Sequence, residues 1–193
     1  MKDINLLLPK VKDMAETFLK ECKAHGYNVV ITHTYRDQKE QDALYAQGRT
    51  TPGNVVTNAK FGDSMHNYKV AIDFAPVKAD GSIDWADMEA FTAIGKIGEG
   101  VGFTWGGRWQ SFIDVPHLQY TAGYTLVDFK AGKIDMKKFD TTSTYKSSPL
   151  RAKAAFALRD WQVQELGVKD FEGETNPDNI RFGPKSAAAF NIK

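Results

Sequence analysis

The chain has 193 residues, of which 42% are hydrophobic and 25% are charged, and its formal net charge is +1. This length allows one good core and a small second unit. The near-zero net charge gives no reason to expect nucleic acid as a partner. The single cysteine, Cys22, excludes an intramolecular disulfide and a zinc site built from several thiolates.

The first predicted element is an amphipathic helix. Apolar residues recur at helical spacing from Leu7 to Cys22, and the pattern closes at His25 and Gly26. The apolar run that follows predicts a strand through about Tyr35.

A shorter helix is expected next. Asp37 and Glu40 have the spacing of a capping box, and this helix should end near Gly48. Residues 49–65 are rich in Thr, Asn, Gly and Pro, so we expect them to form a long loop near a cleft.

A buried strand is predicted at residues 70–75. Three large apolar residues, Val70, Ile72 and Phe74, alternate with Asp73 along this segment. Because side chains alternate between the two faces of a strand, Asp73 should point away from the core and toward a cleft.

The remaining elements complete an α+β domain. Asp84 can cap a helix that ends at Gly98 and Gly100. The apolar residues of this helix are Trp85, Met88, Phe91, Ile94 and Ile97. Strands are expected around residues 101–105 and 116–120, which gives helices packed on one face of a small antiparallel sheet.

The character of the chain changes near residue 139. A polar segment that ends in Pro149 suits an exposed linker, residues 139–150, after a main domain of residues 1–138. Residues 151–193 are expected to form a small all-α unit. A unit of this size has little core of its own, so it should lean on the main domain.

Two short segments place metal-binding side chains beside apolar, strand-like runs. His66 and Asp73 belong to the first segment, and Asp114 and His117 belong to the second. Two imidazoles and one carboxylate form a ligand set that leaves a fourth tetrahedral position on zinc open for water or substrate. The alternative is structural, with His66 capping a loop, Asp73 in a turn and His117 as an ordinary strand histidine.

These segments resemble a known family. Residues 64–74 are similar to the S-x-H-x-x-G-x-A-x-D signature of zinc D,D- and L,D-peptidases, and residues 114–117 are similar to their D-x-x-H signature. Residues 35–36 and 102–109 also have counterparts in the branch of L-alanyl-D-glutamate endopeptidases found in phage endolysins and bacterial autolysins.

The resemblance implies a hedgehog-like or D-alanyl-D-alanine peptidase-like fold with one Zn²⁺ per chain. It makes His66, Asp73 and His117 the zinc ligands. It also makes Asp114 the catalytic acid and base, which takes a proton from the attacking water and returns it to the departing amine. Alternatively, Asp114 only orients His117. Lys69 stands where the signature has glycine, so it must tolerate the backbone geometry that glycine allows or point to solvent.

Five residues are expected to contact substrate: Arg36, Gln41, Ser64, Trp105 and Trp109. The resemblance gives Arg36 the role of anchoring the free carboxylate of D-glutamate, which a guanidinium can grip with two N–H groups. Arg36 could instead pair with Asp37 or Glu40. Ser64 could simply cap a turn, and Trp105 could pack in the core.

The function that the resemblance implies is a peptidoglycan hydrolase that cleaves the L-alanyl-D-glutamate bond of stem peptides in bacterial peptidoglycan. We separately expect the chain to be a monomer. The alternatives are a D-alanyl-D-alanine carboxypeptidase or dipeptidase, and a non-catalytic wall-binding module that keeps the metal for stability.

Location and targeting are predicted from the two ends of the chain. The run Leu6–Leu8 is broken at once by Pro9, so we expect neither a secretory signal nor membrane insertion. A phage endolysin of this kind would stay in the host cytoplasm until it is released to the wall. The segment from Leu158 to Phe190 is similar to a small helical peptidoglycan-binding domain, although it could only complete the main core.

Overall fold

The computed structural model describes residues 2–141 of the chain. Their α-helices are α1 (Pro9–Ala24), α2 (Gln38–Ala46), α3 (Met88–Val101) and α4 (Leu126–Lys130). The strands are β1 (Val29–His33), β2 (Ala71–Pro76), β3 (Thr104–Trp105) and β4 (His117–Gln119). The short 3-10 helices are η1 (Ile4–Leu6), η2 (Met65–Tyr68), η3 (Gly106–Arg108) and η4 (Met136–Phe139). The predicted all-α unit at 151–193, and the predicted linker from residue 142 onward, lie outside the described residues.

The four strands form one antiparallel sheet in the order β1-β2-β4-β3. In its register Ile31 lies opposite Phe74, and Asp73 lies opposite His117. The pairing of β1 with β2 shifts between Ile31 and His33. Central strand β2 therefore brings Asp73 next to residues from both neighbouring strands.

Strand β2 confirms the alternation expected from the sequence. Val70, Ile72 and Phe74 are fully buried in the core. Asp73 points to the opposite face, where it lines a cavity. Burying each of the large side chains contributes about 1.5–3 kcal/mol, so this strand is anchored in one register and cannot slip without exposing them.

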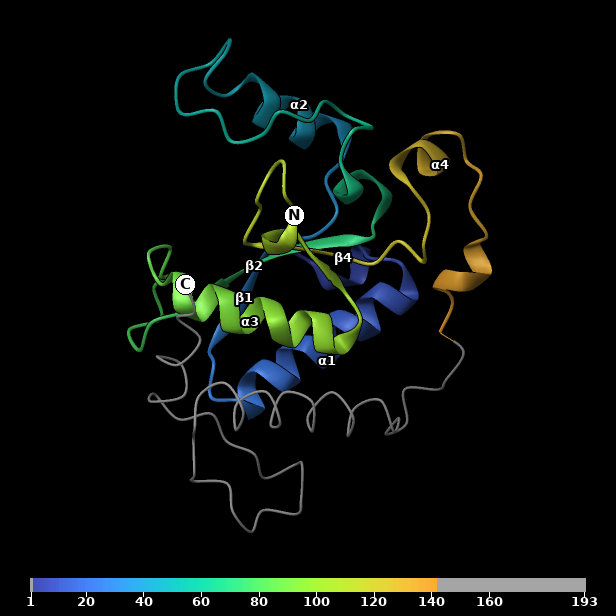
Figure 1. Ribbon diagram of the computed structural model, residues 1–193. Helices are drawn as coiled ribbons and strands as arrows, with labels where there is room; N and C mark the ends of the chain where they lie inside the picture. The colour runs from blue at the N-terminus through green and yellow to red at the C-terminus, as the bar shows by residue number, and fades with distance from the viewer. Residues whose placement is uncertain (1, 142–193) are drawn as a thin grey trace.

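Helices α1 and α3 pack on one face of the sheet (Figure 1). The ring of Phe18 in α1 contacts those of Phe74, at 5.6 Å between centroids, and Phe103, at 6.5 Å. In α3, an added Cβ would come within 2.2 Å of Trp105 at Gly95 and within 2.6 Å of Leu118 at Gly98. The two glycines thus allow α3 to pack closely on the sheet. The expected α+β architecture is confirmed, and no helix within residues 2–141 is long and apolar enough to cross a membrane.

The start of α3 differs from the prediction. Asp87, not Asp84, caps this helix by accepting a hydrogen bond from the N–H of Ala90 at 2.9 Å. The N–H of Asp84 instead donates to the carbonyl of Pro76 at the end of β2, at 2.9 Å. Because that bond holds Asp84 in the loop, Trp85 lies outside the helix.

Candidate functional site

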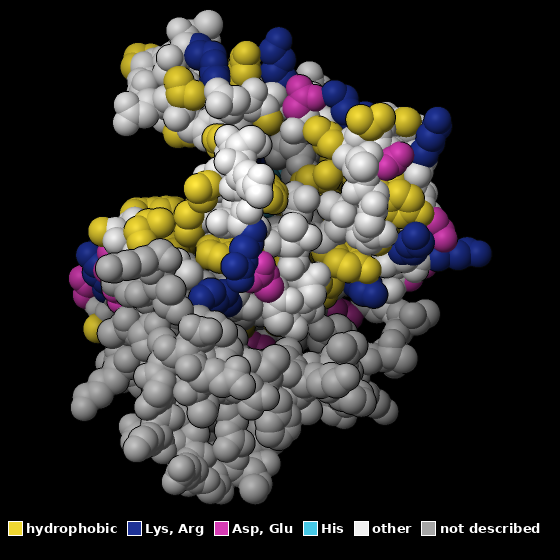
Figure 2. Space-filling model, in the orientation of Figure 1, with side chains coloured by type: hydrophobic (Ala, Val, Ile, Leu, Met, Phe, Trp, Pro, Cys, Tyr) yellow, Lys and Arg dark blue, Asp and Glu magenta, His cyan; other side chains and the backbone are white. Residues whose placement is uncertain are grey.

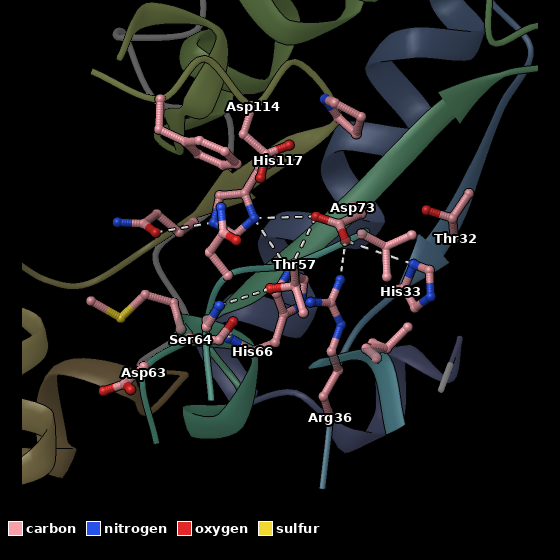
Figure 3. A pocket seen from close by; sticks show the side chains of 18 of the residues that line it. Thr32, His33, Arg36, Thr57, Asp63, Ser64, His66, Asp73, Asp114 and His117 are labelled. Carbon is pink, nitrogen blue, oxygen red and sulfur yellow. Dashed lines mark hydrogen bonds and ion pairs between the residues drawn. The ribbon is translucent and has the colours of Figure 1, made fainter. Parts of the chain in front are cut away.

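A cavity of about 760 Å³ opens on the face of the sheet opposite α1 and α3. Figure 2 shows a hollow on the surface between the part of the chain that carries α2 and the body of the domain. Side chains from β1, β2, β4 and η2 and from the loops around them line this cavity (Figure 3).

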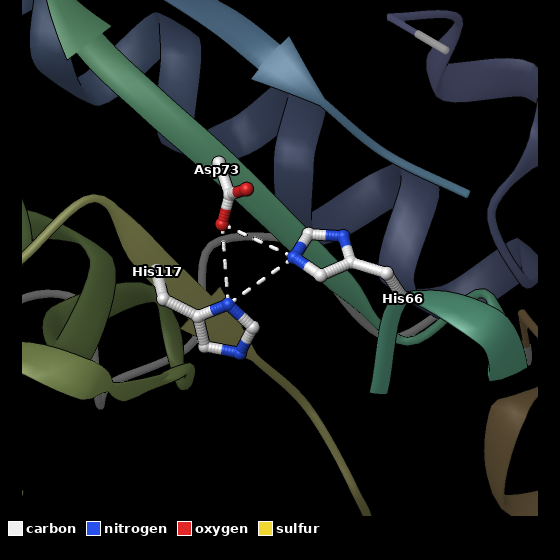
Figure 4. A group of neighbouring side chains, drawn as sticks. All are labelled: His66, Asp73 and His117. Carbon is white, nitrogen blue, oxygen red and sulfur yellow. Dashed lines mark hydrogen bonds and ion pairs between the residues drawn. The ribbon is translucent and has the colours of Figure 1, made fainter. Parts of the chain in front are cut away.

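The three predicted metal ligands converge in the cavity (Figure 4). His66 comes from η2, Asp73 from β2 and His117 from β4. Nε2 of His66 and Nδ1 of His117 each lie 3.1 Å from Oδ1 of Asp73, and the two nitrogens lie 3.2 Å apart. The three residues are 1%, 9% and 6% exposed, respectively. The structure thus brings together side chains that the sequence spaces widely.

Local hydrogen bonds explain why η2 presents His66. The Ser64 hydroxyl accepts a bond from the N–H of His66 at 3.4 Å, and Oδ1 of Asn67 accepts one from the N–H of Gly62 at 2.9 Å. Lys69 ends the turn with φ 64° and ψ 27°, in the left-handed region, and its side chain is exposed. The lysine therefore adopts the backbone geometry for which the signature has glycine.

In each histidine, the ring nitrogen that faces away from Asp73 has its own hydrogen-bond partner, which orients the ring. Nδ1 of His66 lies 2.6 Å from the carbonyl oxygen of Thr34, so this nitrogen carries the proton and Nε2 offers a lone pair. Nε2 of His117 lies 3.0 Å from Oε1 of Gln119, which leaves Nδ1 to face Asp73. Partners of this kind commonly fix metal-binding histidines.

The donor set fits a divalent cation. Because both ring protons point away from the site, the lone pairs of Nε2 of His66, Nδ1 of His117 and Oδ1 of Asp73 face one another and repel. A cation between these three atoms would remove the repulsion. Ligands at about 2.0–2.1 Å from a tetrahedral zinc lie about 3.3 Å apart, close to the spacing of 3.1 to 3.2 Å found here. His66, Asp73 and His117 could therefore hold zinc with little movement.

Burial and neighbouring charges set the ionisation of these groups. Burial lowers the pKa of His66, which keeps its ring neutral. Burial opposes ionisation of Asp73, but His66 and His117 together hold the pKa of Asp73 well below its usual range. Burial opposes the charging of His117, but the neighbouring Asp73 carboxylate raises the pKa of His117 overall. Protons at low pH should therefore compete with a metal ion for this site.

Arg36 contacts the second oxygen of the same carboxylate. Its Nη2 lies 2.5 Å from Oδ2 of Asp73, and Nδ1 of His33 lies 3.7 Å from that oxygen. Arg36 also lines the cavity. The structure thus gives Arg36 a partner different from Asp37 and Glu40, and its predicted role in substrate binding stays a prediction.

Asp114 lies in the same cavity. The three predicted metal-ligand residues lie between Asp114 and Arg36 (Figure 3). Its backbone N–H donates to the carbonyl of Gly106 at 3.1 Å. Its carboxylate is half-buried and makes no hydrogen bond within residues 2–141. Burial raises the pKa of Asp114, and the charge of Asp73 adds to this. A half-buried carboxylate with a raised pKa is suited to exchange protons.

The other predicted substrate residues divide into two pairs. Ser64 and Trp109 line the cavity, and the Trp109 ring lies 5.2 Å from that of His117. Gln41 is fully buried and does not itself line the cavity; it donates to the carbonyl of Ala59, a lining residue, at 2.8 Å. Trp105 is buried, and its Nε1 donates to the carbonyl of Val115 at 2.7 Å.

Two residues of the site had no role in the sequence prediction. Gln119 follows His117 by two positions in β4, so strand alternation was a usable signal for it. His33 lies opposite Asp73 in the sheet. Only the register of β1 against β2 reveals that neighbour, and a single sequence does not contain it.

Sequence comparisons found known proteins similar to this chain. Residues 57–120 match a family model described as D-alanyl-D-alanine carboxypeptidase, and this range contains all three donor residues and Asp114. The peptidoglycan L-alanyl-D-glutamate endopeptidase CwlK of Bacillus subtilis is 47% identical over 122 residues, which are 58% of this chain and 72% of CwlK.

Weaker matches were also found. The L-alanyl-D-glutamate peptidase of Listeria phage A118 is 26% identical over 90% of this chain and 62% of its own length. The crystal structure of the Serratia marcescens L-Ala D-Glu endopeptidase ChiX matches 61% of this chain and 83% of its own, with 18% identity and a TM-score of 0.47. On the identity and coverage shared with CwlK, the chain belongs to the peptidase M15 family and is a metallopeptidase of the L-alanyl-D-glutamate endopeptidase type.

Proposed function

We propose that this enzyme hydrolyses the bond between L-alanine and D-glutamate in peptidoglycan stem peptides, with one zinc ion held by His66, Asp73 and His117. The observation that carries the proposal is the convergence of these three donors in a cavity that also contains Asp114. The names of the relatives support the choice of bond.

Asp114 and the two histidines have different roles in the proposed hydrolysis. Zinc, when bound, would supply a Lewis acid that polarises the peptide carbonyl and makes water more acidic. Asp114 takes the proton from the attacking water and donates it to the departing amine, since its carboxylate has no competing hydrogen bond within the described part of the chain. His66 and His117 keep the protonated side of each ring turned away from the donor cluster.

Arg36 is the proposed anchor for the free carboxylate of D-glutamate. It uses Nη2 to hold Asp73, and it also lines the cavity. A guanidinium has five N–H donors, so one side can orient Asp73 while another binds substrate. Ser64 and Trp109 are proposed as further contacts because they line the same cavity.

Mass spectrometry of digested peptidoglycan tests the proposal. New fragments with N-terminal D-glutamate, lost on chelation and restored by zinc, are expected. Release of D-alanine instead would favour a carboxypeptidase, which the description of the matching family model keeps as the second candidate. Asp114→Ala separates either enzyme from a non-catalytic wall-binding module, because only an enzyme should lose turnover while its metal affinity persists.

Peptidoglycan is the proposed partner, and the similarity to a phage peptidase supports a role in host lysis. We further propose that the chain acts as a monomer and that residues 151–193 add affinity for the wall. Removing residues 151–193 should then weaken binding to purified walls and spare hydrolysis of a soluble muropeptide.

A further inference from the structure

The cavity has two chemically different ends. Arg36 marks one end, because its guanidinium is held at Asp73, with Nη2 2.5 Å from Oδ2 of that residue. Trp85 marks the other, because the preceding residue, Asp84, is bonded to Pro76 at the end of β2. One end therefore carries a guanidinium and the other an aromatic ring.

A second aromatic residue lines the same cavity. The N–H of Phe74 donates to the carbonyl of Pro116 at 3.0 Å, and the segment before Pro116 is held to η3 by the bond from the N–H of Asp114 to the carbonyl of Gly106. Phe112 belongs to that segment and lines the cavity together with Trp85. Asp114, from the same segment, lies opposite Arg36 across the donor cluster (Figure 3).

Both aromatic side chains are open to a ligand. Trp85 is 56% exposed and Phe112 is 57% exposed. The ring of Trp85 is stacked on that of Phe91, with 6.1 Å between centroids and 22° between planes, so its position is supported by the core. Large exposed aromatic residues that line a cavity indicate a binding surface.

The chemistry of peptidoglycan limits what these rings can bind. Stem peptides carry small or charged side chains, such as those of alanine, glutamate and a diamino acid, which do not need an aromatic wall. The pyranose rings of the glycan do have extended apolar faces. N-acetylmuramic acid is joined through its lactyl group to the L-alanine, one residue away from the bond to D-glutamate.

The dimensions agree with this assignment. Pro76 lies three residues beyond Asp73 along β2, which corresponds to about 10 Å. One extended residue and a lactyl group together span about 7–8 Å. A substrate whose D-glutamate lies at Arg36 would therefore place its sugar near Trp85 and Phe112.

We propose that Trp85 and Phe112 form a subsite for the N-acetylmuramic acid that precedes the cleaved peptide, which fixes the direction of the substrate in the cavity. The inference rests on the proposed cleavage of the L-alanyl-D-glutamate bond. It makes the enzyme selective for stem peptides that are still attached to glycan.

Two substrates test the subsite: N-acetylmuramyl tripeptide and the same tripeptide without the sugar. The zinc-loaded full chain should have the higher kcat/KM for the muramyl substrate. Trp85→Ala should lower kcat/KM for the muramyl substrate about tenfold more than for the free peptide, mainly through KM, and Trp85→Phe should restore much of the loss. Ile113→Ala is the matched control, because Ile113 is 65% exposed beside Phe112 and does not line the cavity.

The outcomes separate this inference from the proposed function. If both substrates are cleaved and Trp85→Ala affects them equally, the sugar subsite is wrong and the cleavage specificity stands. If the protein cleaves neither, both proposals fail. Calorimetry with N-acetylmuramyl-L-alanine, the expected product that carries the sugar, measures binding without turnover. Trp85→Ala should weaken this binding. Equal binding by the unchanged protein and the variant would overturn the subsite.

Discussion

Replacing Gln119 by leucine tests whether this residue prepares His117 to bind metal. Oε1 of Gln119 lies 3.0 Å from Nε2 of His117, whose side chain is almost completely buried. Without that acceptor, the ring must either leave a buried N–H unsatisfied or move its proton to Nδ1, which faces Asp73. Either change weakens the site for a cation.

The magnitude follows from the burial of His117. An unsatisfied buried N–H costs about 1–3 kcal/mol, which corresponds to a loss of about 5- to 150-fold in zinc affinity. This range agrees with the effect of about 10- to 100-fold that is typical for partners of metal ligands. Gln119→Glu keeps an acceptor and adds negative charge, so it should bind zinc at least as tightly as the unchanged protein.

Competition with a chromophoric chelator, at fixed pH and starting from zinc-free protein, measures this affinity directly. Gln110→Leu is the matched control, because Gln110 is exposed and does not line the cavity. Circular dichroism would verify that each variant folds. Zinc affinity of Gln119→Leu within about twofold of the control would refute the orienting role.

Three further changes test the site. Asp114→Asn should lower kcat by about 10²- to 10⁴-fold, and retained turnover would contradict the role of Asp114 as base. The same change should raise Tm of the metal-free protein, because it removes a carboxylate that burial makes costly to ionise, as its raised pKa indicates. Because a base must be ionised, kcat/KM should fall as pH drops through the pKa of Asp114, which burial raises above its usual value. A flat profile there would argue against Asp114 as the base. Lys69→Gly should stabilise the fold by about 0.5–1 kcal/mol in urea unfolding, because φ 64° strains a lysine and not a glycine; zinc affinity should not change.

The sequence by itself determined the elements and the chemical types at the site. The buried face of α1, the cap at Asp37 and the inward side of β2 depend on spacing along a few residues, so a local pattern is enough to predict them. The same holds for His66 and Asp73, which lie in one short segment whose residue order already matched a family signature.

The tertiary structure decided what those side chains contact. Arg36 is bonded to Asp73, 37 positions away, and not to the acids beside it in the chain. Gln41 and Trp105 turn inward because Ala59 and Val115 offer carbonyls there. Trp85 reaches the cavity only because its loop is tied to the end of β2. These neighbours depend on strand register and packing between distant segments, and neither follows from residue spacing within one segment.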